Sequence, residues 1–78
     1  MIGKAIKYMR NQKNLNQEQL ADLLKIERTT LSGYETERRN PTFELIEKIA
    51  KECGYKIYFI NKETKEKFQI KDLLRKDI

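Results

Sequence analysis

The stretch QEQLADLLKIERTTLSGYE, residues 17–35, decides how the chain folds. Apolar residues recur at helical spacing in each half, and polar residues separate the two halves. The spacing predicts a first helix over residues 17–24, a turn at residues 25–27 and a second helix over residues 28–35. Ala21 is small enough to let the second helix cross the first closely.

Both helices have a buried stripe, and the first also has a start signal. Leu20 and Leu24 lie on the buried side of the first helix, and Leu31 is the central core residue of the second. Asn16 is a good N-cap, and Gln19 three residues later completes a capping-box pattern. These patterns predict where the helical pair begins and which side of it is buried.

Two further helices flank this pair. Apolar residues at helical spacing predict one over residues 2–13, and Asn14 then suits the left-handed conformation that ends many helices. Another is predicted from the N-cap Thr42 to about Cys53, and Gly54 is a stop signal. The chain up to Gly54 is therefore expected to be helical.

After Gly54 the pattern changes to β-branched and aromatic residues. Residues 55–60 predict a strand, residues 61–66 a polar turn and residues 67–70 a second strand, which together make a β-hairpin. An isolated hairpin is marginal in water, so it must pack on something. Because the first strand is apolar on both faces, we expect its own helices on one side and a second subunit on the other. The tail, residues 71–78, is expected to form a short helix or to fray.

Composition limits the range of partners. The 78 residues include 17 Lys and Arg against 12 Asp and Glu, which gives a formal charge of +5. A basic surplus favours nucleic acid first and an anionic membrane or acidic partner second, and a merely solvated surface is the alternative. No apolar run reaches the ~20 residues of a membrane span. The first residues lack the apolar core of a signal peptide, so we expect an intracellular, cytoplasmic protein.

The residue types present exclude most catalytic chemistry. The chain has no histidine and one cysteine, Cys53. Their scarcity removes the usual zinc sites, the Ser–His and Cys–His nucleophile pairs and the commonest general base. We therefore expect neither an enzyme nor a cofactor or metal site, and we expect Cys53 to pack in the core.

With these residues at these spacings, the chain resembles the lambda-repressor/Cro-like, or Xre-type, helix-turn-helix family of bacterial and phage regulators. The resemblance covers residues 2–54. The segments that carry it are Leu15–Ala21, Leu31–Glu35, Asn40–Thr42 and Lys48–Lys51. It implies a mainly α fold, with a five-helix lambda-repressor-like DNA-binding domain at residues 1–54 and its motif at residues 17–36. Residues 55–78 are then a C-terminal hairpin extension with a short tail.

The resemblance also implies which residues meet DNA. Gln17, at the start of the first motif helix, would contact a phosphate. Arg28, Thr29 and the position of Gly33, on the second motif helix, would face bases. The family's usual pairing further implies that Glu35 orients a basic neighbour such as Arg10.

Side-chain chemistry supports two kinds of base contact. Arg28 can donate two hydrogen bonds to guanine O6 and N7, and the alternative is a surface ion pair with Glu27 or Asp22, or a phosphate contact alone. Thr29 and Ser32 can each place a hydroxyl on a base edge, and the alternative is that both are ordinary helix-surface residues.

Basic and amide side chains around the motif are candidates for phosphate contacts. They are Arg10, near the end of the first helix of the chain, and Arg38, Arg39 and Asn40 in the loop after the motif. The alternative is a solvated run of charge.

Three positions depart from the family's usual residues. Lys25 stands where glycine is usual, which costs about 1 kcal/mol if the turn stays left-handed. Glu27 is a poor N-cap for the second motif helix. Gly33 carries no side chain with which to read a base. Recognition is therefore expected to depend more on Arg28, on phosphates and on a second subunit.

Together these inferences predict a DNA-binding transcriptional regulator, namely a repressor that binds a palindromic operator as a homodimer. The dimerisation candidates are the apolar residues of the first strand: Tyr55, Ile57, Tyr58, Phe59 and Ile60. The alternative is an antitoxin-like interaction module, which would bind a toxin-like protein partner through the C-terminal strands and regulate its own operon. Neither reading involves a membrane.

Overall fold

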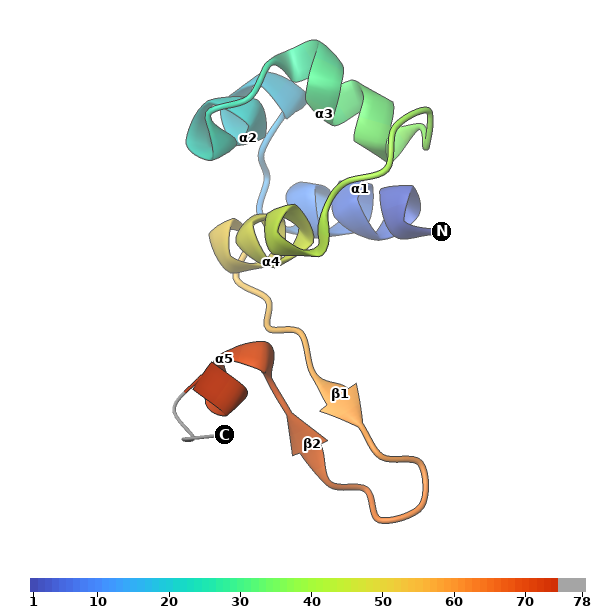
Figure 1. Cartoon of the computed structure of the whole chain (residues 1–78). Coiled ribbons are helices and arrows are strands. Elements are labelled where there is room, and N and C mark those ends of the chain that lie inside the picture. Colours follow the sequence, from blue (N-terminus) through green and yellow to red (C-terminus); the bar gives the residue numbers. More distant parts are fainter. Residues whose placement is uncertain (75–78) are drawn as a thin grey trace.

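Helical spacing and capping in the first part of the chain produce four helices: α1 (Ile2–Gln12), α2 (Gln17–Leu24), α3 (Arg28–Glu35) and α4 (Phe43–Glu52). The computed structural model describes residues 1–74 and continues into β1 (Phe59–Ile60), β2 (Lys67–Phe68) and α5 (Ile70–Leu74) (Figure 1). The predicted fold class is confirmed, since the described residues form five helices and a C-terminal hairpin. The fifth helix follows the hairpin rather than α4.

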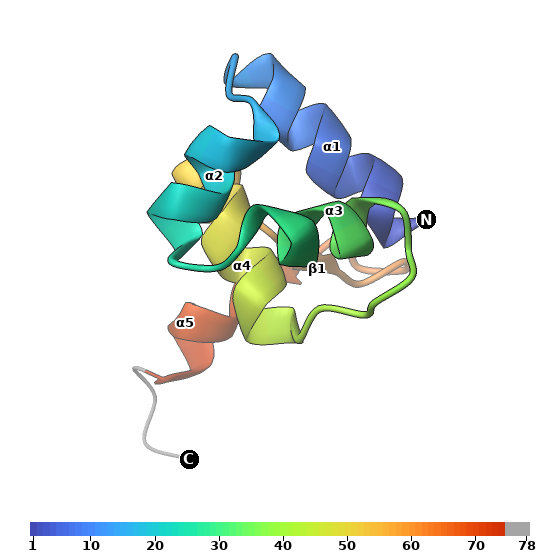
Figure 2. The ribbon, with the colours of Figure 1, turned by 90° about the horizontal axis from the view of Figure 1, so that it is seen from above.

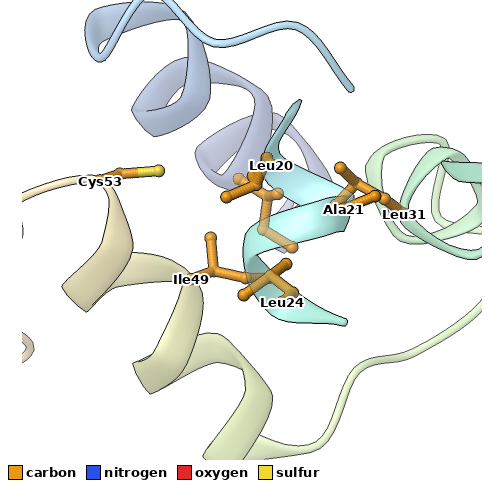
Figure 3. Close-up of a cluster of buried hydrophobic side chains, with 7 residues drawn as sticks. Leu20, Ala21, Leu24, Leu31, Ile49 and Cys53 are labelled. Carbon is orange, nitrogen blue, oxygen red and sulfur yellow. The ribbon is translucent and has the colours of Figure 1, made fainter. Parts of the chain in front are cut away.

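The core takes one fully buried large side chain from each of the first four helices. They are Ile6, Leu20, Leu31 and Ile49, and Ala21, Leu24 and Cys53 complete the cluster (Figure 3). Burying a large apolar side chain contributes about 1.5–3 kcal/mol, so this cluster holds α1, α2, α3 and α4 together. Seen from above, α1, α2 and α3 lie around α4 (Figure 2). The buried stripe predicted for the helical pair is confirmed.

Caps and turns set the ends of α2 and α3. The Asn16 side chain accepts a hydrogen bond from the Gln19 N–H (2.8 Å), and the Gln19 side chain accepts one from the Asn16 N–H (2.9 Å). The predicted capping box is therefore confirmed. Lys25 keeps the left-handed conformation at the turn (φ 58°), as does Asn14 after α1 (φ 60°). Glu27 is the N-cap of α3, but its side chain makes no capping hydrogen bond within the described residues.

The hairpin is confirmed, but its strands are shorter than the sequence predicts. Strands are predicted over residues 55–60 and 67–70, whereas β1 and β2 are two residues long each. They pair antiparallel, with Phe59 opposite Phe68 and Ile60 opposite Lys67.

Neighbouring helices shorten both strands. The Tyr55 N–H donates to the carbonyl oxygen of Ala50 (2.7 Å), so this backbone closes the end of α4 instead of entering a sheet. The Gln69 N–H donates to the Asp72 carboxylate (2.9 Å) and so begins α5. The tail thus starts as a short helix, and Ile78 lies outside the described residues.

An aromatic stack joins the hairpin to the helical body. The Phe59 ring lies 5.9 Å from the Phe43 ring of α4 and 5.3 Å from the Phe68 ring of β2, measured between centroids. Both separations are in the range of attractive aromatic pairs. The stack touches α4 through Phe43 without covering the hairpin, since Phe59 is 41% and Phe68 37% exposed; on the opposite face Tyr58 and Ile60 are 40% and 60% exposed.

Cys53 belongs to the core, as predicted. Its side chain is buried at the end of α4, and this burial raises the pKa of the thiol. Because the thiolate is the reactive form, a raised pKa and a buried sulfur both make Cys53 unreactive at neutral pH.

Gly3 lets the start of α1 press against the end of α3. A Cβ placed on Gly3 would lie 2.5 Å from the backbone oxygen of Glu35 and 2.7 Å from that of Tyr34. Any side chain here would therefore push α1 and α3 apart. Arg10 lies two turns further along the same face of α1, so this close approach also brings Arg10 to α3.

We expect Gly3→Ala to destabilise the protein by about 1–3 kcal/mol, the usual cost of overpacking. The expected sign is informative, because alanine normally stabilises a helix relative to glycine. Thermal unfolding followed by circular dichroism should show a melting temperature lower by roughly 4–8 °C for each kcal/mol. Lys4→Ala, at an exposed neighbouring position, should change it little. A Gly3→Ala protein as stable as the wild type would refute the close approach.

Candidate nucleic-acid interface

The outer surface of α3, with α2 beside it, lies on the side of the molecule away from the hairpin (Figure 1). Arg28 and Thr29, at the start of α3, are exposed, and Ser32 one turn later is half-buried. These side chains make the outward face of α3 polar. An exposed helix of this width fits the major groove of DNA.

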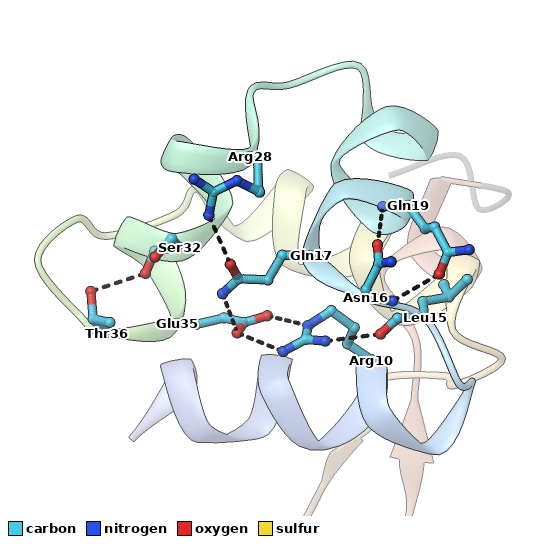
Figure 4. A network of polar contacts seen from close by, with 9 residues as sticks. All are labelled: Arg10, Leu15, Asn16, Gln17, Gln19, Arg28, Ser32, Glu35 and Thr36. Carbon is cyan, nitrogen blue, oxygen red and sulfur yellow. Dashed lines mark hydrogen bonds and ion pairs between the residues drawn. The ribbon is translucent and has the colours of Figure 1, made fainter.

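A buried ion pair ties α1 to α3. The Arg10 Nε donates to Glu35 Oε2 (2.7 Å) and the Arg10 Nη2 donates to Glu35 Oε1 (3.1 Å), which makes a bidentate pair (Figure 4). The Arg10 Nη1 donates to the backbone oxygen of Leu15 (2.8 Å). The two side chains are only 9% and 3% exposed. The expected pairing of Glu35 with Arg10 is confirmed.

The polar contacts continue from this ion pair to the exposed start of α3. The Gln17 Nε2 donates to Glu35 Oε1 (3.0 Å), and the Gln17 Oε1 accepts from Arg28 Nη1 (3.3 Å) (Figure 4). Gln17 thereby bridges a buried carboxylate and a surface guanidinium. Among residues 1–74, this contact replaces the alternative ion pair of Arg28 with Glu27 or Asp22. Within residues 1–74, the other N–H donors of the Arg28 guanidinium make no hydrogen bond.

The burial of Arg10 argues against the expected phosphate contact. Its guanidinium is buried and donates to Glu35 and Leu15 on two sides. The side chain therefore faces the interior, because α1 packs against α3 there. Arg10 is thus placed to orient Glu35.

The packing around Gly33 does not favour the expected base contact by this residue itself. This residue is buried, because the Arg39 side chain lies across it. A Cβ placed on Gly33 would lie 3.1 Å from Arg39 Cδ and 3.3 Å from Arg39 Cγ. The surface presented at this point of α3 therefore belongs to Arg39.

The loop after α3 carries the other basic candidates. Arg38, Arg39 and Asn40 are all exposed, as a phosphate contact requires. The backbone N–H groups of Arg38 and Arg39 both donate to the carbonyl oxygen of Gly33 (2.9 and 3.2 Å). These bonds fold the loop back onto the end of α3, so its cations lie beside the exposed helix face.

Sequence reasoning missed two residues that shape this loop. The Thr36 hydroxyl donates to the backbone oxygen of Ser32 (2.9 Å), a local back-bond that threonine's chemistry could have suggested. Glu37 adopts a left-handed conformation (φ 65°), which its residue type disfavours. Its carboxylate pairs with the Met1 amine and accepts from the Gly3 N–H (3.1 Å), and these hydrogen bonds lower the pKa of Glu37.

The exposed α3, crossed by α2 across a tight turn, defines a helix-turn-helix DNA-binding domain. A profile of the helix-turn-helix family matches residues 6–60. The chain belongs to this family, the Cro/C1-type helix-turn-helix proteins that include lambda-repressor-like and Xre-type regulators. It is accordingly a DNA-binding transcription regulator. Searches of curated proteins and of solved structures gave no significant match.

Membrane insertion finds no support in the helices. None of those within residues 1–74 is long and apolar enough to cross a bilayer.

Removing one partner of the buried ion pair should destabilise the protein far more than removing both. Arg10→Met leaves the Glu35 carboxylate buried without its cation, which typically costs about 3–5 kcal/mol. Arg10→Met combined with Glu35→Met removes both charges and should recover much of that loss. Urea unfolding followed by circular dichroism measures the free energy of unfolding for each variant.

Lys7→Met is the control for this series, because Lys7 is an exposed residue of α1. It should change the free energy of unfolding little. If the double variant is destabilised as much as Arg10→Met or more, the ion pair is not the coupled unit described above.

Proposed function

We propose that the protein represses transcription by binding a palindromic operator as a homodimer. The observation that carries the proposal is the anchored position of Arg28. This surface guanidinium is held through Gln17 by the buried Arg10–Glu35 pair. A preorganised side chain at the start of an exposed helix is what reading a base edge requires.

Arg28 is the main sequence reader in this proposal. One of its N–H donors is used by Gln17, so the other donors of the fork can meet guanine O6 and N7. Thr29 is exposed beside it and offers a hydroxyl to a base edge and a methyl to thymine. Ser32 is half-buried, so its hydroxyl makes a secondary contact.

Phosphate contacts surround these readers. Gln17 keeps one amide N–H beyond its bond to Glu35, and it lies at the positive end of α2, where anions bind favourably. Arg38 and Asn40 lie in the exposed loop at the other end of α3. Contacts at both ends would hold α3 in the groove and set its register without reading sequence.

The hairpin is the dimerisation element of the proposal. Tyr58 and Ile60 project from the face of the hairpin opposite the Phe59–Phe43 contact, and Phe59 and Tyr55 also remain well exposed. Ile57 is half-buried beside them. A second hairpin would bury these apolar groups. A dimer of this kind would set two α3 helices on half-sites about 34 Å apart.

The exposed apolar hairpin also supports a second candidate function. The same surface could receive a toxin-like protein instead of a second copy, which would make the chain an antitoxin-like module that regulates its own operon. In either case the protein would act in the cytoplasm on DNA, with no cofactor and no catalytic role.

Arg28→Ala should remove sequence preference while keeping most of the non-specific binding. A bidentate guanine contact contributes about 1–3 kcal/mol of discrimination, and that difference between operator and unrelated DNA should shrink accordingly. Fluorescence anisotropy on both DNAs, with the operator found by random-site selection, measures it.

Arg38→Ala is the matched control for Arg28→Ala. Because Arg38 is proposed to contact a phosphate, its loss should weaken binding to both DNAs alike. It should also reduce the slope of log K against log salt by about 0.9. If Arg28→Ala also weakens binding to both DNAs alike, Arg28 is not a base reader.

Ile60→Glu should convert the dimer to a monomer. The substitution places a charge on the apolar face of the hairpin, where a second copy would leave it buried and unpaired. Sedimentation equilibrium gives the mass directly. Lys62→Glu adds an acid in the exposed turn and should leave the dimer intact. An unchanged dimer mass in Ile60→Glu would remove the hairpin from the interface.

A further inference from the structure

The Arg39 side chain occupies a gap that Gly33 leaves on α3. The distances from a Cβ placed on Gly33 are 3.1 Å to Arg39 Cδ, 3.3 Å to Arg39 Cγ and 3.6 Å to Arg39 Nε. The aliphatic stem of Arg39 therefore crosses the helix where a side chain at position 33 would begin. Glycine is among the poorest helix formers, so its presence in the last turns of a short helix calls for a reason.

Backbone hydrogen bonds fix the start of the Arg39 side chain. The N–H groups of Arg38 and Arg39 both donate to the carbonyl oxygen of Gly33, at 2.9 and 3.2 Å. The Thr36 hydroxyl, held by the backbone oxygen of Ser32 (2.9 Å), accepts a hydrogen bond from Arg38 Nε (3.3 Å). Arg38 is thereby drawn to Thr36, and Arg39 is left lying over the glycine.

The guanidinium of Arg39 is the one that the fold leaves unused. Within residues 1–74, hydrogen bonds engage the guanidinium groups of Arg10, Arg28 and Arg38, whereas that of Arg39 makes none. Arg39 is also exposed. Its five donors are therefore available to a ligand that presents hydrogen-bond acceptors.

Position 33 lies on the same face of α3 as the proposed base readers. It follows Thr29 by four residues, and residues four apart lie one above the other on a helix. A side chain that crosses Gly33 thus leaves the helix on the face that carries Thr29.

We infer that Arg39 is a second sequence-reading residue, which crosses the gap at Gly33 and donates its hydrogen bonds to a guanine in the major groove. The inference rests on the proposed function, since it assumes that α3 enters that groove. It reassigns Arg39 from the phosphate contacts that the sequence predicts. The missing side chain at position 33 is thereby replaced by one supplied from the loop.

Random-site selection followed by affinity measurements on single-base variants of the selected site tests the assignment. In Arg39→Ala and Arg39→Lys, the preference for guanine at one position of each half-site should fall about 5- to 140-fold, and other positions should keep their preferences. Arg39→Lys is the sharper variant, because it keeps the charge and loses the planar fork.

Gly33→Ala probes the gap itself. The new methyl group would press on the Arg39 stem and should reduce the same guanine preference, while the melting temperature should stay the same or rise because alanine favours a helix. Arg38→Ala should keep the base preferences of the wild type at every position of the site and reduce the slope of log K against log salt.

Each contrary outcome has one meaning. If both Arg39 variants keep the base preferences of the wild type and weaken binding to all sequences alike, Arg39 is a phosphate contact and the inference is wrong. If Gly33→Ala keeps the base preferences and the DNA affinity of the wild type, the gap does not position Arg39. If the wild type itself selects no sequence, the proposed function fails, and this inference fails with it.

Discussion

The bidentate pair between Arg10 and Glu35 is the interaction on which the DNA-facing surface depends. It joins α1 to α3 inside the protein, where removing two charges from water is costly unless every polar atom finds a partner. The Leu15 carbonyl oxygen accepts a further hydrogen bond from Arg10, and the Gln17 amide donates one to the Glu35 carboxylate. Because Gln17 also holds Arg28, a buried electrostatic constraint fixes the position of a side chain on the surface.

Three arginines show how one residue type is divided between structure and recognition. Arg10 is buried, and its guanidinium donates hydrogen bonds to Glu35 and Leu15 inside the protein. Arg28 is exposed and tied by one N–H, and Arg39 is exposed and makes no side-chain hydrogen bond within the described residues. Their different roles follow from which neighbours the packing places beside them. Formal charge alone, +5 for the chain, does not distinguish them.

Local features of the fold were predictable from sequence, and features that depend on distant contacts were not. The bounds of α1 to α4, the Asn16–Gln19 capping box and the left-handed Asn14 follow from neighbours within a turn, so periodicity and capping rules find them. The burial of Arg10 and the cover of Gly33 by Arg39 require segments that meet only after folding. The strands were overpredicted because β-propensity does not say where a partner strand ends.

The two faces of the hairpin constrain how the proposed dimer can meet DNA. Phe59 stacks on Phe43 of α4 and on Phe68, which joins the hairpin to the body, and Tyr58 and Ile60 project from the opposite face. The hairpin lies on the side of the molecule away from α3 (Figure 1). Both α3 helices can then reach one DNA duplex only if the hairpins pack side by side, with the two-fold axis running from hairpin towards α3. End-to-end packing would point the two helices in opposite directions. The aromatic stack on Phe43 is therefore as relevant to operator geometry as α3 itself, because it joins the proposed dimerisation element to the helices that carry α3.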